Sequence, residues 1–482
     1  MYTVLWIFIT IQILMGGTDT MYHHELTEKL AWRKTQTQEL WLHGIRNIFY
    51  ALIFLGLATI QPDGIWAYAI ITALCAEFLI TLWDFVEEDL TRKLPVSERL
   101  LHTVLTANYG VVLALLIPVL WGWGQNPTGL EKAWHGYWSM FLIFGAVVVF
   151  ILGLRDFHAR ARLQKLFTRP AKDLIERIET PKTVLMTGGT GFIGRKLIPA
   201  LQAAGYKIIV LTRNSKTAAL PAPVTYIENF DQIHNRDKID IIINFAGEAL
   251  STGLWTEKKK TAITESRIGL TEKLNRLIAR LDTPPELLLN GSAIGAYGVN
   301  PAGDIDETTK IDVDGTFSQK LCLDWEAEAL KAKEHGLRVV LLRIGMVLDR
   351  EGAALRQLLI PTEFGGGATF GKGKKFMSWI TRDDLVGMIG HVIQSTDING
   401  AVNGVGPNPV TNKAFTKAVA KALYRPTLVA IPEFIIKALG GLGREILLAD
   451  QKILPKAVLK TGYIFKDPVI EEAMMLQLRA QK

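Results

Sequence analysis

The chain has 482 residues, of which 49% are hydrophobic, and its 54 Lys and Arg against 47 Asp and Glu give a formal net charge of +7. The length allows two or three domains, the hydrophobic content is high for a soluble protein, and the modest positive charge requires no nucleic-acid partner. With two cysteines, Cys75 and Cys322, a disulfide framework is excluded and a reducing compartment is indicated.

Five apolar segments precede residue 155. They are Tyr2–Gly17, Asn47–Ile60, Ile65–Leu82, Leu100–Trp121 and Trp138–Leu154. A helix that crosses a bilayer needs about 20 apolar residues, which the fourth segment supplies alone and the third and fifth supply with their flanks. Buried helices of a soluble protein are the alternative, but almost no strand signal separates these segments. We therefore predict a transmembrane helical bundle over residues 1–154.

The distribution of Lys and Arg predicts how this bundle is oriented. Basic residues gather in Thr18–Arg46, in Asp84–Arg99 and after residue 155, whereas Gln61–Gly64 and Gly122–Ala133 together carry only Lys132. Because positive loops stay on the cytoplasmic side, we expect an integral protein of the inner or plasma membrane. Its N-terminus would lie outside, and residues 155–482 would lie in the cytoplasm.

Polar residues recur at helical spacing within the bundle. The stripe of the third segment is Glu77, Thr81, Asp84 and Glu88, that of the fourth is His102, Thr106 and Tyr109, and His23, His24, His43 and Asn47 lie toward the same side. Carboxylates facing imidazoles can bind a divalent metal or relay protons, but side chains that reach out to interfacial water explain the same pattern. No metal signature with strong spacing is present, so we predict no metal site.

A basic linker is predicted over residues 155–181, and a glycine-rich run, KTVLMTGGTGFIG, follows at Lys182–Gly194. An apolar run, a glycine turn and an amphipathic helix (Arg195–Ala204) give the strand–turn–helix context of a dinucleotide fingerprint. The first glycine allows the tight turn, the third lets the backbone approach a pyrophosphate, and the last lets the helix pack closely. The predicted cofactor-binding residues of this run are Gly188, Thr190, Gly191, Phe192, Ile193 and Gly194.

Further apolar strands alternate with helical stretches after this run. They are Tyr206–Leu211, Asp240–Phe245, Glu286–Asn290 and Arg338–Arg343. Nearly continuous Ile, Val and Leu in strands between helices indicates a parallel sheet covered on both faces. We therefore predict an α/β Rossmann-like, doubly wound domain over residues 182–402, whose ligands bind outside the carboxyl ends of the strands.

Residues that follow these strands predict the cofactor. Arg213, with Lys216 nearby, stands where an acidic residue would grip the ribose of NAD, so NADP is favoured over NAD. A solvated surface arginine is the alternative. Ala246 and Gly247 leave room for a cofactor to pass, and Glu248 comes next, so these three are added to the cofactor-binding residues.

Several motifs together resemble a known family. They are TGGTGFIG, NFAGE at Asn244–Glu248, WTEKKK at Trp255–Lys260, SRIG at Ser266–Gly269, LLRIGMVLD at Leu341–Asp349 and MSWITRDDL at Met377–Leu385. They resemble the atypical or extended short-chain dehydrogenase/reductase superfamily, and within it the epimerase-family NAD(P)-binding subgroup. That resemblance implies a small, α-rich C-terminal domain of uncharacterised function, here residues 403–482. It does not cover the N-terminal bundle.

The chain departs from this superfamily at the catalytic Tyr-x-x-x-Lys pair, whose lysine lowers the pKa of the tyrosine. Ser318 and Cys322 occupy the two positions. Ser292 and Tyr297, which follow the strand at Glu286–Asn290, are the alternative catalytic candidates. We predict a membrane-anchored NADP-dependent oxidoreductase or epimerase-like protein with a small-molecule or lipid-linked substrate. A catalytically silent NADP-binding sensor or regulatory domain fused to the bundle is the alternative.

Overall fold

The computed structural model describes residues 2–91, 94–215, 220, 223–250, 255–363, 367–427, 429–438, 440 and 442–479. The chain divides into two compact units, which meet in sequence between Leu166 and Phe167. Lys216, named above beside Arg213, falls outside the described residues.

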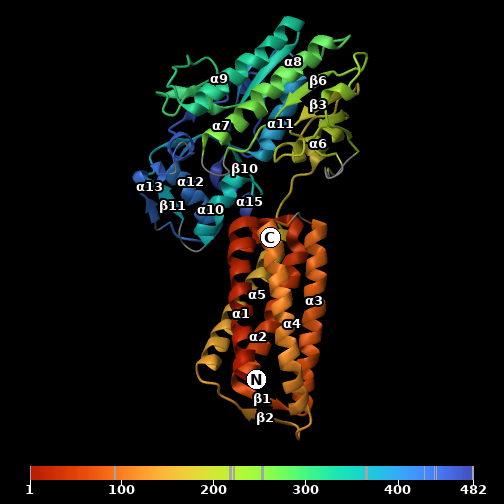
Figure 1. The fold of residues 1–482 in the computed structure, drawn as a ribbon. Helices are drawn as coiled ribbons and strands as arrows, with labels where there is room; N and C mark the ends of the chain where they lie inside the picture. Colours follow the sequence, from red (N-terminus) through yellow and green to blue (C-terminus); the bar gives the residue numbers. More distant parts are fainter. Residues whose placement is uncertain are drawn as a thin grey trace. The chain divides into compact units, whose positions relative to one another are not determined.

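The first unit is a bundle of five long helices that lie side by side (Figure 1). They are α1 (Tyr2–Asp19), α2 (Thr37–Thr59), α3 (Ile65–Thr91), α4 (Val96–Gly124) and α5 (Tyr137–Gln164). A short antiparallel pair, β1 (Ile60–Asp63) and β2 (Gly129–Lys132), joins the connections at the end of the bundle where α1 begins. Among the described residues, five helices are long and apolar enough to cross a membrane.

The helices extend beyond the apolar segments that the sequence indicated. Helix α5 continues to Gln164 rather than ending at Leu154, so the start of the predicted linker is helical. No Gly or Pro interrupts this extension, and its arginines find partners within the bundle. Arg155 donates to Glu25 (Nη2 to Oε2, 2.7 Å), and Arg162 donates to the carbonyl of Ala31 at 2.8 Å.

The second unit is built on a seven-stranded sheet with the order β14-β9-β7-β6-β3-β4-β5, and all of its strand pairs are parallel. The strands are β3 (Thr183–Thr187), β4 (Lys207–Leu211), β5 (Thr225–Ile227), β6 (Ile241–Asn244), β7 (Leu287–Ala293), β9 (Arg338–Ile344) and β14 (Gly400–Gly404). The chain first builds outward from β3 to β5 and then crosses to β6 on the other side. This reversal places a topological switch point at the carboxyl ends of β3 and β6, where such sheets bind ligands. The predicted Rossmann-like architecture is confirmed.

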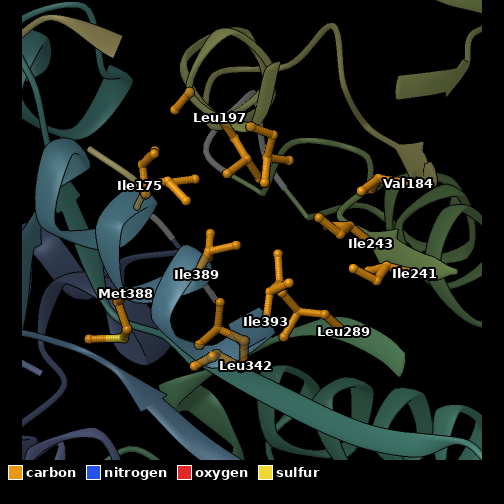
Figure 2. Packing of buried hydrophobic residues seen from close by; sticks show 14 of the residues in the cluster. Ile175, Val184, Leu197, Ile241, Ile243, Leu289, Leu342, Met388, Ile389 and Ile393 are labelled. Atoms are coloured by element: carbon orange, nitrogen blue, oxygen red, sulfur yellow. The ribbon is translucent and has the colours of Figure 1, made fainter. Parts of the chain in front are cut away.

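Helices cover both faces of this sheet. Helices α6 (Gly194–Ala203) and α11 (Arg382–Gln394) pack on one face, and α8 (Leu270–Arg280) and α9 (Phe317–Leu330) pack on the other. Figure 2 shows Ile243, Leu289 and Leu342 of the sheet facing Ile389 and Ile393 of α11. Leu174 and Ile175 join this core, so the end of the predicted linker is packed structure instead of a free connector.

The C-terminal residues are not a separate layer. The predicted boundary between residues 402 and 403 falls inside β14, which is an integral strand because it pairs with β9 along its whole length. The helices beyond it are α12 (Asn412–Ala422), α13 (Glu433–Lys437), α14 (Lys456–Lys460) and α15 (Ile470–Leu478). Short strands β16 (Val429–Ile431) and β17 (Lys452–Ile453) pair with β11 (Ala368–Phe370) and β8 (Asp304–Ile305).

Candidate functional site

The glycine-rich loop joins β3 to α6 at the switch point. Gly188 has a φ of +72°, and a Cβ there would lie 2.6 Å from the backbone of Phe245. A Cβ on Gly194 would lie 2.3 Å from the carbonyl oxygen of Gly189, so only glycine lets α6 begin this close to the turn. The free amides at the start of this helix and its positive dipole end form a site for phosphate.

Side chains of the loop hold it against the rest of the unit. The ring of Phe192 lies 4.4 Å below the guanidinium of Arg382, and Ile193 packs on the core. The carbonyl of Thr190 accepts a hydrogen bond from Arg195 Nε at 2.9 Å, and Gly191 N donates to Gly188 O at 3.0 Å. These contacts leave the backbone of the turn as the surface that a dinucleotide would meet.

A buried hydrogen-bond network fixes the strand ends beneath this loop. Asn244 at the end of β6 accepts from Thr187 Oγ1 at 2.6 Å and donates to Asn290 Oδ1 at 2.7 Å. Its amide also donates to Thr271 Oγ1 at 2.9 Å, which in turn accepts from Trp325 Nε1 at 3.0 Å. Because satisfied buried networks rigidify a core, three neighbouring strands are locked where the cofactor would lie.

Positive charge surrounds the far end of the cofactor cleft. Arg213 is exposed just after β4, and Lys259 Nζ lies 2.6 Å from the carboxylate of Glu248. Lys259 holds the pKa of Glu248 below its usual value, and Arg213 and Arg267 act in the same direction. One carboxylate thus faces three cations, and the excess positive charge favours an anionic 2′-phosphate.

Arg267 is a further cation at this edge, on an irregular turn of helix. The segment Glu265–Gly269 is a π-helical turn between α7 (Glu257–Thr264) and α8, a feature that often occurs at functional sites. Arg267 Nη1 donates to the carbonyl of Glu248 at 3.1 Å, and a Cβ on Gly247 would lie 2.8 Å from the guanidinium carbon. Burial lowers the pKa of Arg267, the expected cost for a guanidinium of low exposure. The guanidinium of Arg267 therefore lies against the backbone of Gly247, and a side chain at that position would displace it.

The two catalytic candidates belong to one buried network. Ser292, near the end of β7, donates to Glu326 Oε1 at 2.6 Å. The carboxylate of Glu326 also accepts hydrogen bonds from Nε (2.9 Å) and Nη2 (2.7 Å) of Arg343. The guanidinium of Arg343 lies 4.7 Å from the ring centre of Tyr297, whose hydroxyl donates to Asn403 Oδ1 at 2.9 Å.

This arrangement bears on the proposed role of Tyr297. Arg343 is a nearby cation of the kind that would lower the pKa of the phenol, but burial outweighs it and the pKa is raised. Tyr297 and Ser292 are 4% and 5% exposed, and each already has an internal partner. Their catalytic roles remain predictions.

Ser318 and Cys322, at the expected positions of the Tyr-x-x-x-Lys pair, lie beside this network. Neither side chain can carry out the proton transfer of that pair. A Cβ on Gly295 would lie 3.6 Å from Cys322 Sγ and 3.7 Å from Ser318 Cβ, so both residues pack on the turn after β7. Burial raises the pKa of the Cys322 thiol to about 11, which keeps it protonated at neutral pH. Lys320 is exposed, as expected for a residue out of register.

In the bundle, the predicted polar stripes face inward and meet. Glu77, Asp84 and Glu88 on α3 are at most 1% exposed, and the hydroxyl of Tyr109 on α4 donates to Glu77. His102 Nε2 lies 3.0 Å from Asp19 Oδ2. The face that periodicity identified on each helix is therefore an interior face.

The sheet order and the glycine loop at the switch point define a Rossmann-type dinucleotide-binding protein. Comparison with family models gives the NAD dependent epimerase/dehydratase family over residues 184–403 and a domain of unknown function, DUF1731, over residues 431–475. An Arabidopsis thaliana chloroplastic homologue of the epimerase family protein SDR39U1 is 34% identical over 304 residues, which cover 61% of this chain and 86% of the relative. The Bacillus subtilis epimerase family protein YfhF is 33% identical, over 60% of this chain and 96% of its own length.

A solved structure agrees with these sequence matches. The crystal structure of human SDR39U1 with NADPH is 30% identical, with a TM-score of 0.55 over 61% of this chain and 99% of the human chain. The chain therefore belongs to the epimerase family of NAD(P)-binding proteins, with DUF1731 following the nucleotide-binding domain. The predicted resemblance is confirmed.

Sequence reasoning missed Glu326 and Arg343. One signal was present: Arg343 follows four apolar residues, Val339–Leu342, in a central strand, where an unpaired charge is too costly to be tolerated. The sequence did not show which carboxylate forms the ion pair with Arg343.

Proposed function

We propose that the chain is a membrane-anchored, NADP-dependent oxidoreductase or epimerase-like enzyme. The observation that carries the cofactor choice is the cluster of Arg213, Lys259 and Arg267 around the single carboxylate of Glu248 at the edge of the cleft. The relative whose structure contains NADPH supports the same choice. The five long apolar helices support anchoring in a bilayer. The distribution of Lys and Arg favours a cytoplasmic second unit.

The glycine loop would hold the pyrophosphate, since Gly188 and Gly194 leave space that any side chain would fill. When bound, NADP supplies or accepts a hydride. Ser292 is the residue that would touch a substrate oxygen, because it stands near the carboxyl end of β7 and Glu326 holds its hydroxyl in place. Glu326 and Arg343 are positioning residues that act through Ser292. The substrate class is a small molecule or a lipid-linked molecule reached from the membrane.

Arg213→Ala tests the cofactor assignment. A charge-assisted contact with the 2′-phosphate contributes about 1.5–3 kcal/mol, so the dissociation constant for NADPH should rise about tenfold or more while that for NADH hardly changes. Lys207→Ala is the matched control, because it removes an exposed cation at the opposite end of the same strand. Equal losses for both cofactors, or tighter NADH than NADPH binding by the parent, would contradict the assignment.

A catalytically silent NADP sensor is the second candidate. It is favoured by the expected placement of Ser318 and Cys322 at the positions of the usual proton-transfer pair. Burial also raises the pKa of the Cys322 thiol to about 11. Incubation of the purified full chain with NADPH and membrane or metabolite extract distinguishes the two. Oxidation of NADPH that is lost in Ser292→Ala supports the enzyme. Tight NADPH binding without turnover across such extracts supports the sensor.

A further inference from the structure

Helices α1, α2, α3 and α4 and the π-helical segment Thr20–Glu28, which carries His24, converge on a cluster of imidazoles and carboxylates. One group consists of Asp19, His24, Glu98 and His102, and the other of His24, Glu39, His43 and Glu88. Within each group, one potential ligand atom per residue lies within 4.8 Å of all the others. Of these seven residues, all except His102 are buried, and His102 has a side-chain exposure of 12%.

A repeated spacing builds this cluster. Glu39 and His43 on α2, and Glu98 and His102 on α4, each stand four residues apart, as ELWLH and ERLLH. Residues at i and i+4 lie one above the other on a helix, so each helix presents a carboxylate and an imidazole on one face. Asp19 from the end of α1 and Glu88 from α3 complete the two groups.

One contact inside the cluster has the length of an ordinary hydrogen bond, His102 Nε2 to Asp19 Oδ2 at 3.0 Å, whereas several others are longer. His24 Nε2 lies 3.4 Å from Asp19 Oδ2 and 3.7 Å from Glu98 Oε1. His102 Nδ1 lies 3.4 Å from Glu88 Oε2, and His43 Nε2 lies 4.0 Å from Glu88 Oε1. These separations exceed a normal N–H···O hydrogen bond of about 2.7–3.2 Å. They match neighbouring ligands of a shared ion, which stand roughly 3–4 Å apart when each bond is about 2.0–2.2 Å long.

Other features of the cluster favour a metal. Among the described residues, buried His43 Nε2 and Asp84 Oδ1 have no hydrogen-bond partner of good geometry, although His43 Nε2 lies 3.1 Å from Asp84 Oδ2. The rings of His24 and His43 are stacked, with centres 4.6 Å apart and planes 5° apart. The stacking places His43 of the second group against His24, which belongs to both groups.

Outer partners hold the ligands in place. His23 Nδ1 lies 2.7 Å from Asp19 Oδ1, the oxygen not directed at His102, and His23 Nε2 lies 3.1 Å from Ser97 Oγ. Second partners of this kind orient the carboxylates and imidazoles of metal centres. A largely apolar cavity of about 630 Å³ lies beside the cluster. Its polar lining includes Asp19, His24, His43, Glu88 and His102, so an ion bound by these residues would face the cavity.

We propose that this cluster is a metal centre that binds at least one divalent first-row transition-metal ion inside the bundle. The mixture of imidazole and carboxylate ligands suits Zn²⁺, Fe²⁺, Mn²⁺ or Co²⁺ better than Mg²⁺ or Ca²⁺, which prefer oxygen alone. The proposal replaces the sequence-based expectation of no metal site. It is independent of the cofactor assignment of the second unit.

The test uses the full chain in detergent, stripped with a chelator and titrated with Co²⁺ alone. The parent should bind at least one Co²⁺ per chain, with visible absorption bands from the bound ion. His43→Gln and His102→Gln, each drawn from one group, should lower Co²⁺ affinity by about tenfold or more. His158→Gln is the matched control, because His158 is exposed on α5 and should bind Co²⁺ like the parent.

Folding of each variant is checked by its NADPH affinity, by its elution as a single species, and by whether added Co²⁺ raises its melting temperature. Co²⁺ should raise the melting temperature of the parent and of His158→Gln, and raise that of the two ligand variants less. Failure of the parent to bind Co²⁺, Zn²⁺ or Mn²⁺, or unchanged Co²⁺ affinity in both folded ligand variants, would overturn the proposal and leave an ion-pair network. Loss of Co²⁺ binding with NADPH binding intact supports it.

Discussion

Removing Glu326 should destabilise the second unit strongly, because it leaves a buried guanidinium without its counter-ion. Glu326 and Arg343 are 5% and 6% exposed, and the carboxylate accepts three hydrogen bonds, one from Ser292 and two from Arg343. Breaking a buried pair by deleting one partner typically costs about 3–5 kcal/mol. Since a domain is stable by only about 5–15 kcal/mol, Glu326→Ala should remove a large fraction of that stability.

A double variant separates two contributions to the free energy of unfolding. One is the cost of leaving a buried charge without its partner, and the other is the net contribution of the intact ion pair. Glu326→Leu with Arg343→Met removes both charges and keeps most of the buried volume. Replacing a whole buried pair in this way is often neutral or stabilising, so the double variant should be more stable than Glu326→Ala. We expect a coupling free energy of about 2 kcal/mol or more between the two positions.

Hydrogen exchange of the full-length protein measures this effect where it arises. Peptides covering β7 and β9 report the opening free energy of the central sheet separately from the bundle. Glu334→Ala, which removes an exposed glutamate from the helical turn after α9, is the control and should stay within about 0.5 kcal/mol of the parent. A loss below about 1 kcal/mol in Glu326→Ala, or a double variant as unstable as the sum of its parts, would refute the reasoning.

Three further outcomes follow from the geometry. Tyr297→Phe should cost about 0.5–1.5 kcal/mol in the same exchange experiment, through the lost bond to Asn403, while NADPH-dependent turnover persists; abolished turnover at unchanged stability would instead make Tyr297 the proton donor. Gly194→Ala should abolish NADPH binding in the purified protein, because its Cβ would lie 2.3 Å from a backbone oxygen that has little freedom to move, and parent-like affinity would contradict the close packing of α6. In whole cells, an impermeant thiol reagent should label a cysteine placed at Asn126 and not one placed at Ser215, in a background with Cys75 and Cys322 replaced; the reverse pattern would reject the proposed topology.

Much of the fold was accessible from the sequence because its signals are local. Apolar runs between helices predicted β4, β6, β7 and β9 to within a few residues, and the glycine run predicted the loop at the switch point. The boundaries were less accurate, since they depend on contacts made elsewhere. Helix α5 outruns its apolar segment because its arginines meet Glu25 and the carbonyl of Ala31, and β14 crosses a predicted domain boundary because β9 supplies its partner.

The sites illustrate the same limit. Periodicity identified the inward faces of α3 and α4, but it did not show that Glu39 and Glu98 join them, because each helix was considered alone. The Glu-x-x-x-His spacing that α2 and α4 share becomes informative only when the two helices are known to meet. In the second unit, Ser292 and Tyr297 were chosen for their place after a strand, whereas their partners Glu326 and Arg343 come from α9 and β9.

The missing proton-transfer pair narrows the chemistry that the second unit can perform. Epimerisation through a transient ketone needs a base that takes the proton of a substrate hydroxyl as the hydride leaves. Cys322 is protonated, and the hydroxyl of Tyr297 is engaged by Asn403 under conditions that raise its pKa, so neither fills that role as the structure stands. Ser292 can orient a substrate oxygen, and its proton lies on a path to Glu326, but Arg343 holds that carboxylate with two hydrogen bonds and weakens it as a base. A one-way reduction whose proton comes from solvent makes smaller demands on these residues than epimerisation does. We therefore propose that, if the second unit is an enzyme, it catalyses a reduction and not an epimerisation.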